Sequence, residues 1–185
     1  MRALMHLSPL ALLLAATLFG AQPTPPPPSR IFDQQLTMLE HEFVPLAEAM
    51  PADKFAFAPT GGEFKGVRTF GQQVSHTAAV IYAVSAAVLG EKNPTDMGKE
   101  ENGPASVKTK EETIKYLKNA ITYGHKAMGS LTEKNLTELI PSAFGESKVP
   151  RVSMASTAIW HSFDHYGQMV VYARMNGIVP PASRR

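Results

Sequence analysis

Two histidines lie four residues apart in the segment 160–165, which reads WHSFDH. On an α-helix this spacing turns the side chains of His161 and His165 only about 40° apart and places their Cβ atoms about 6 Å from each other. Two imidazoles so placed can bind one metal ion. The alternative is that both rings are simply packed and hydrogen-bonded on a half-buried surface.

Ser162 and His76 indicate which kind of metal site the two histidines could form. Serine follows His161 where a zinc metalloprotease helix carries glutamate as the general base, so the protease interpretation fails. His76 lies on the apolar side of a second predicted helix, where an imidazole without a partner loses hydration. A hydrogen-bonded core histidine is the ordinary explanation, but three inward histidines from two helices predict a divalent-metal site with open positions.

Four segments must position these side chains. Each carries apolar residues at alternating steps of three and four, the pattern of an amphipathic helix. The segments span residues 30–50, 70–89, 109–131 and 153–176. Because no stretch shows the sustained alternation of a strand, we predict an all-α four-helix bundle.

Local signals mark the ends of these helices. Capping boxes, each a threonine with Gln or Glu three residues later, predict helix starts at Thr69–Gln72 and Thr109–Glu112. Gly90 and Gly177 are predicted stops. Pro45 lies inside the first helix and should kink or interrupt it.

Two irregular segments connect the helices. Residues 91–108 are polar and contain prolines and glycines. This connection is long enough to cross the end of a bundle. A second irregular stretch, residues 132–151, leads to the last helix.

The composition excludes several kinds of site. The 185 residues include no cysteine, so disulfides, thiolate ligands and cysteine nucleophiles are ruled out. Eighteen basic and sixteen acidic residues are mixed along the chain, and without a basic stripe we expect no binding to nucleic acid. The hydrophobic share of 44% is enough for one domain with a buried core.

The N-terminal segment predicts export. Residue Arg2 precedes an apolar run over 7–19, and small residues follow, which is the pattern of a secretory signal peptide over residues 1–21. A proline-rich linker over 22–29 separates it from a domain over 30–185. We therefore expect an exported protein, periplasmic or secreted, with no stable membrane span after signal removal. An uncleaved anchor is the less favoured alternative.

Three motifs together resemble one family. The sequence HSFDHYGQ at 161–168, with its continuation to Gly177 and the following prolines, closely resembles the C-terminal signature of the DinB-like superfamily. The sequence TFGQQVSH at 69–76 resembles that family's helix-two motif, which carries its first ligand histidine. The segment 50–59, MPADKFAFAP, resembles the loop after its first helix. The resemblance covers about residues 31–181.

This resemblance implies a four-helix bundle of up-down-down-up topology that holds one divalent metal ion on His76, His161 and His165. Nickel or zinc is the expected ion, and three imidazoles also suit iron or manganese. Tyr166 departs from the family pattern, because many members have a basic residue there. The resemblance therefore carries no role in binding an anionic substrate over to this position.

Other residues near the predicted site are weaker candidates for a part in catalysis. Gln168 could hydrogen-bond a ligand imidazole, or could simply join two helices as a buried amide. Asp164 could orient an imidazole on a neighbouring helix, although a surface carboxylate is the more ordinary reading. His125 could face the pocket as a base or an extra ligand, or could be a buried structural histidine. Glu40 flanks the first helix's apolar stripe and could reach the cleft, and Tyr172 is expected to pack in the core.

Two classes of function remain open at this stage. One is a metal-dependent hydrolase or transferase that acts on a small molecule through metal-bound water. The other is a non-catalytic bundle that binds a metal or a ligand, in which the ion fastens two helices. The substrate is not defined by the residues, and the sequence allows a homodimer.

Overall fold

The four predicted helices are present in the computed structural model, which describes residues 24–184. Their bounds are α1 Pro28–Ala49, α2 Phe70–Leu89, α3 Lys110–Gly129 and α4 Arg151–Met175. The predicted signal peptide, residues 1–21, lies outside the described residues, as do linker residues 22 and 23. Among the residues described, no helix has both the length and the apolar content needed to cross a membrane.

The helix ends follow from the local sequence. Both predicted capping boxes form, Thr69 with Gln72 and Thr109 with Glu112, so the first free N–H groups of α2 and α3 have acceptors. Gly90 adopts the left-handed conformation, with a φ of 69°, that ends α2. Pro45 was predicted to kink or interrupt α1, and the second alternative is corrected, because the helix continues without interruption to Ala49.

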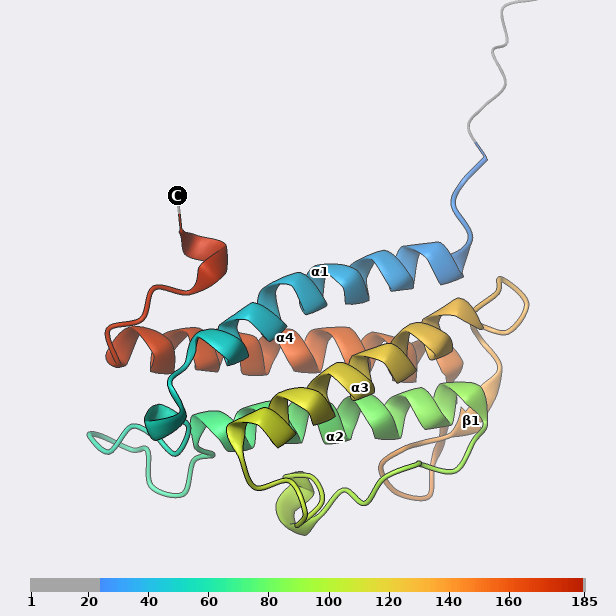
Figure 1. Cartoon of the computed structure of the whole chain (residues 1–185). Helices are drawn as coiled ribbons and strands as arrows, with labels where there is room; N and C mark the ends of the chain where they lie inside the picture. Colours follow the sequence, from blue (N-terminus) through green and yellow to red (C-terminus); the bar gives the residue numbers. More distant parts are fainter. Residues whose placement is uncertain (1–23, 185) are drawn as a thin grey trace, which may run out of the picture.

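The helices run in the order up, down, down, up (Figure 1). Helices α1 and α4 run in one direction, and α2 and α3 run in the other. Helix α2 packs against α3 and α4, and α1 packs against the same two helices from the other side. Helix α2 is buried around most of its circumference, so a polar side chain on it must find a partner inside the protein.

The long connection after α2 differs from the prediction. Because α2 and α3 are parallel, residues 90–109 run back along the bundle, instead of only crossing one end (Figure 1). A short 3₁₀ turn, η2 Lys99–Glu101, interrupts this connection, and another, η1 Ala52–Lys54, follows α1. The connection contacts α2 at η2, which brings loop residues beside the helix that carries His76.

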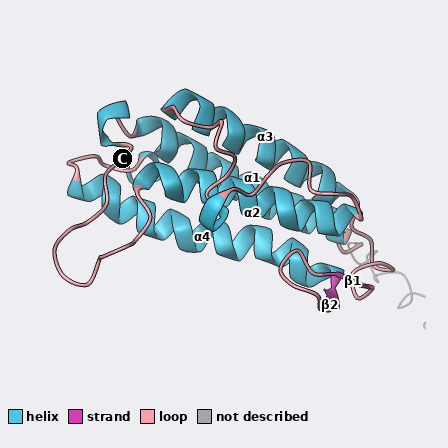
Figure 2. Ribbon diagram, turned by 90° about the horizontal axis from the view of Figure 1, so that it is seen from below, coloured by secondary structure: helices cyan, strands magenta, loops and turns pink. Residues whose placement is uncertain are grey.

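A small antiparallel hairpin lies in the connection between α3 and α4. Strands β1 Leu139–Pro141 and β2 Lys148–Pro150 pair at one end of the bundle (Figure 2). Each strand has three residues, which is too short to show sustained alternation in the sequence. The hairpin leaves the all-α class unchanged.

Candidate metal centre

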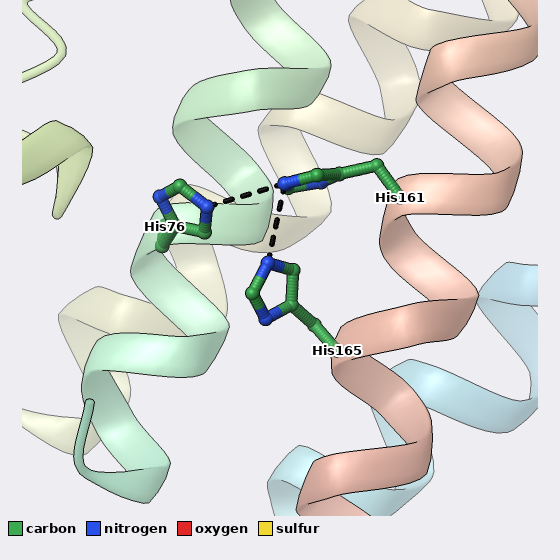
Figure 3. A group of neighbouring side chains, drawn as sticks. All are labelled: His76, His161 and His165. Carbon is green, nitrogen blue, oxygen red and sulfur yellow. Dashed lines mark hydrogen bonds between the residues drawn. The ribbon is translucent and has the colours of Figure 1, made fainter. Parts of the chain in front are cut away.

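The three predicted histidines meet between α2 and α4 (Figure 3). Nε2 of His161 lies 3.2 Å from Nε2 of His76 and 3.2 Å from Nε2 of His165. The possible ligand atoms of the three residues all lie within 4.8 Å of one another. Imidazole nitrogens bound at about 2.0–2.1 Å around a tetrahedral ion lie roughly 3.3 Å apart, so the two closest separations match such a site.

In His76 and His165, the Nδ1 atom, which faces away from the cluster, has a hydrogen-bond acceptor. Nδ1 of His76 donates to the backbone oxygen of Glu101 at 3.0 Å. Nδ1 of His165 donates to the side-chain oxygen of Gln73. A carbonyl oxygen can only accept, so both rings carry their proton on Nδ1. The unprotonated Nε2 atoms of both rings therefore face the centre of the cluster.

This arrangement fits a bound cation. Two Nε2 lone pairs face Nε2 of His161, and one proton on that atom would have to serve both acceptors. A metal ion accepts all three lone pairs together. Nδ1 of His161 is buried and has no hydrogen-bond partner within residues 24–184, so the polar contacts of this ring are on its Nε2 side.

A chain of side-chain hydrogen bonds supports His165 from behind. The nitrogen of the Gln73 amide donates to Gln168 Oε1 at 2.9 Å, and the nitrogen of Gln168 donates to Asp164 Oδ2 at 3.1 Å. A carboxylate only accepts, so Asp164 sets the direction of both amides. The oxygen of Gln73 is therefore the atom that faces His165.

Burial keeps the three rings neutral. His76 and His165 are 4% and 7% exposed, and His161 is partly exposed. Burial, followed by the charge of the neighbouring histidine, lowers the pKa of His161 to about 4 and that of His165 to about 3. The pKa of His76 is also lowered, first by burial and then by the charge of Arg68. Metal ligands must be unprotonated, so these rings are ready to bind at neutral pH.

The weaker candidates from the sequence lie elsewhere or act indirectly. Gln168 joins α4 to α2 through Gln73 and makes no hydrogen bond to an imidazole of the described residues. Asp164 is exposed, and its link to His165 passes through both amides. Tyr172 is buried in the core, as expected.

His125 lies away from the cluster, between α3 and α1. Its Nδ1 is 2.6 Å from Asp33 Oδ1, and its Nε2 is 3.3 Å from Glu40 Oε2. The two acceptors lie on opposite sides of the ring, so the three groups do not converge on one point. The predicted possibility that Glu40 reaches a cleft gives way to this contact with His125.

Sequence reasoning missed Gln73 and Glu101. Gln73 lies one turn before His76 on α2 and is 2% exposed. The only signal for it in the sequence was its position on the same side of the helix as His76. Glu101 acts through its backbone oxygen, a group that every residue carries, so the sequence holds no signal for it.

One groove of the molecule lies away from the three histidines. It has a volume of about 860 Å³ and lies along the start of α2 and the segment 96–113, with none of the three rings in its lining. The convergence of ligand atoms, not the size of a cavity, therefore defines the candidate site. Exposed Trp160, whose ring lies 5.9 Å from that of His161, marks the side where the cluster approaches the surface.

A four-helix bundle with three inward histidines is the class of protein that the fold and the site define. Residues 35–169 match the family model of the DinB superfamily, and the chain belongs to this superfamily. No curated protein matches the chain.

Solved structures show the same fold. A DinB-like protein from Bacillus cereus ATCC 10987 is 21% identical, with a TM-score of 0.65, over 81% of this chain and 93% of the other. A DinB-like protein from Bacillus subtilis is 18% identical, with a TM-score of 0.63, over 84% of this chain and 99% of the other. At these identities the likeness establishes the bundle architecture.

Proposed function

We propose that this protein binds one divalent metal ion through the Nε2 atoms of His76, His161 and His165. The observation that carries the proposal is the fixed orientation of the His76 and His165 rings. The Nδ1 atoms of both rings donate hydrogen bonds, and the lone pairs of their Nε2 atoms point towards Nε2 of His161. Nickel and zinc suit a set of neutral imidazoles best, and iron or manganese would bind more weakly to the same nitrogens.

The proposed activity is hydrolysis of a small molecule, or transfer of a group to or from one. A divalent ion would supply Lewis acidity and would lower the pKa of water towards neutrality. The described residues add no fourth histidine, cysteine or carboxylate to the group, which favours a site with positions open to a substrate. The protein's own contribution is to hold three neutral rings in place.

The alternative is a non-catalytic role in which the ion fastens α2 to α4. His76 comes from α2 and the other two histidines come from α4, so a bound ion would join the helices in either case. A structural site usually has four protein ligands. The described residues provide three, so we favour the open, catalytic site.

Export remains a proposal that rests on the sequence alone. The basic residue and the apolar run before residue 20 support it. Expression of the full chain in a bacterial host, followed by N-terminal sequencing of the periplasmic fraction, should give a start near residue 22. A product that keeps Met1 in the cytoplasm would contradict export.

Elemental analysis of the purified protein tests metal binding. We expect about one equivalent of a divalent metal in the wild type and none in a variant with His76→Ala, His161→Ala and His165→Ala. The matched control is His41→Ala, which removes an exposed histidine on α1 and should keep its metal. A folded triple variant with the same metal content would refute the proposal.

Assays on the metal-loaded wild type, the chelated wild type and the single variant His161→Ala test catalysis. Turnover of small esters, amides or phosphoesters should require the metal and should disappear in His161→Ala. Turnover that persists in the chelated protein would contradict a metal-dependent enzyme, while a metal-loaded protein without turnover on any of them would favour the non-catalytic alternative.

A further inference from the structure

Arg68 is a fixed cation beside the three histidines. Its Nε donates to Asn102 Oδ1 at 2.9 Å, and its Nη2 donates to the backbone oxygen of Glu100 at 2.7 Å. Both acceptors are neutral, and within residues 24–184 no carboxylate oxygen lies within ion-pair distance of Arg68. The guanidinium is therefore held in place while its charge remains unneutralised.

The loop that holds Arg68 also holds His76. Glu100 provides the oxygen for Arg68, and the next residue, Glu101, provides the oxygen for Nδ1 of His76. Both glutamates have positive φ, 56° and 59°, a conformation that non-glycine residues seldom adopt. Such a backbone is kept where surrounding contacts fix it, often at functional sites. Here it lets consecutive carbonyl groups position a metal-ligand candidate and a cation together.

The charge of Arg68 lies close to the cluster. The backbone oxygens that accept from Arg68 and from His76 belong to consecutive residues, Glu100 and Glu101. One short stretch of loop therefore holds a guanidinium and a candidate metal ligand near each other, and the cluster has a positive charge as a neighbour before any metal ion binds.

A site that only stores a divalent cation gains nothing from such a neighbour, because like charges repel. The arrangement is accounted for if the site also receives an anion. Arg68 uses its Nε–Nη2 edge for the loop, and its Nη1 group has no hydrogen-bond partner among the residues described. The Nη1–Nη2 edge has the geometry that binds two oxygens of a carboxylate or a phosphate group.

We propose that Arg68 binds the oxyanion group of a small-molecule substrate, a carboxylate or a phosphate, beside the metal ion. This inference rests on the proposed metal site and names the substrate class for it. Arg68 is a binding residue in this account, and it takes no part in holding the metal.

Cobalt(II) loaded into the full-length mature protein provides the test, because its visible spectrum reports both metal binding and ligand binding. Cobalt is titrated first, and then inorganic phosphate or oxalate is titrated into the loaded protein. The variants are Arg68→Gln, which removes the charge, and Arg68→Lys, which keeps the charge but loses the two-oxygen edge. Arg174→Gln is the matched control, an exposed arginine nine residues beyond His165 on α4, about 13 Å along the helix.

We expect at least one of the two anions to bind the wild type, and the comparison of oxalate with phosphate distinguishes a carboxylate from a phosphate site. Arg68→Gln should weaken anion binding at least tenfold and should bind cobalt more tightly than the wild type. Arg68→Lys should fall between the two, and Arg174→Gln should match the wild type. The opposite signs for anion and metal separate a binding role from general damage to the loop, which would weaken both.

Three outcomes overturn the inference. Anion binding of wild-type strength in cobalt-loaded Arg68→Gln would show that Arg68 is not the anion-binding residue. A cobalt-loaded wild type that responds to neither anion would remove the proposed substrate class while leaving the metal site intact. A wild type that binds no cobalt would refute the metal proposal itself. If Arg68→Gln does not fold, Arg68→Lys decides, and wild-type anion binding in that variant would contradict the need for the two-oxygen edge.

Discussion

Gln73 and His165 face each other across the interface of α2 and α4, and the amide oxygen of Gln73 accepts the Nδ1 proton of His165. The two residues are 92 positions apart in the chain. The contact fixes the ring so that its Nε2 atom points at the other two histidines. Partners of this kind, behind a metal ligand, set its tautomer and its basicity.

The first prediction concerns this contact. Gln73→Leu keeps a similar volume but removes the acceptor, so the His165 ring can turn or exchange its tautomer. We expect metal affinity to fall about 10- to 100-fold, measured by competition with a chromophoric chelator. Gln168→Ala is the matched control: it removes the next link, which is exposed, and should cost less. Unchanged affinity in Gln73→Leu would mean that the contact does not position the ligand.

The second prediction concerns the loop that holds His76. Gly98 has a φ of 70°, and an added Cβ would lie 1.8 Å from the backbone oxygen of Gly103. Gly98→Ala must therefore displace the loop, and with it the Glu101 oxygen that orients His76. We expect both lower stability and weaker metal binding. Gly66→Ala is the control, because Gly66 also has positive φ but nothing within 4 Å of its Cβ position; equal metal affinity in the two variants would count against the loop's role.

The third prediction concerns acid stability of the metal-free protein. Below the ordinary histidine pKa of 6.5, the unfolded chain takes up protons, while the folded rings with pKa values of about 4 and about 3 stay neutral. The unfolded state then binds more protons, so the free energy of unfolding falls as the pH falls from about 6.5 towards 4. The slope is at most about 1.4 kcal/mol per pH unit for each such histidine, and it vanishes above about pH 7.

Urea unfolding at several pH values, with chelator present, measures this slope. His165→Gln removes one of the buried rings and should show a shallower loss of stability between pH 6.5 and 4. Identical pH dependence in the two proteins would contradict the account of neutral, buried histidines. Other titrating groups affect both proteins alike, so the difference between them is the diagnostic quantity.

The fourth prediction separates His125 from the metal centre. His125 contacts the carboxylates of Asp33 and Glu40 through its two ring nitrogens, and all three groups are partly exposed. His125→Ala should therefore lower the free energy of unfolding by about 1 kcal/mol. Metal content should stay at the wild-type value, and its loss would show that His125 belongs to the site.

The helices could be predicted because their signals are local. The apolar steps of α3 and the pairing of Thr109 with Glu112 lie within one segment of chain, and the structure confirms the start of that helix. The hairpin of β1 and β2 could not, because three residues in a strand carry no measurable period. The path of residues 90–109 depends on the relative direction of α2 and α3, which no local pattern encodes.

The site was partly predictable for a related reason. The spacing of His161 and His165 is a property of one helix, and the apolar side of α2 placed His76 near them. Their supports come from distant segments: Gln73 meets α4 only in the folded bundle, and Glu101 contributes a backbone oxygen from a loop. Arg68 acts through the same loop, so its proximity to the histidines became visible only with the fold.

Anomalous diffraction from crystals of the metal-loaded protein tests the central claim most directly. Data collected on both sides of the absorption edge of the bound metal should give one strong peak between α2 and α4. That peak should lie about 2.0–2.2 Å from Nε2 of each of His76, His161 and His165. A loaded crystal with no peak there, or with its metal at other residues, would contradict the account.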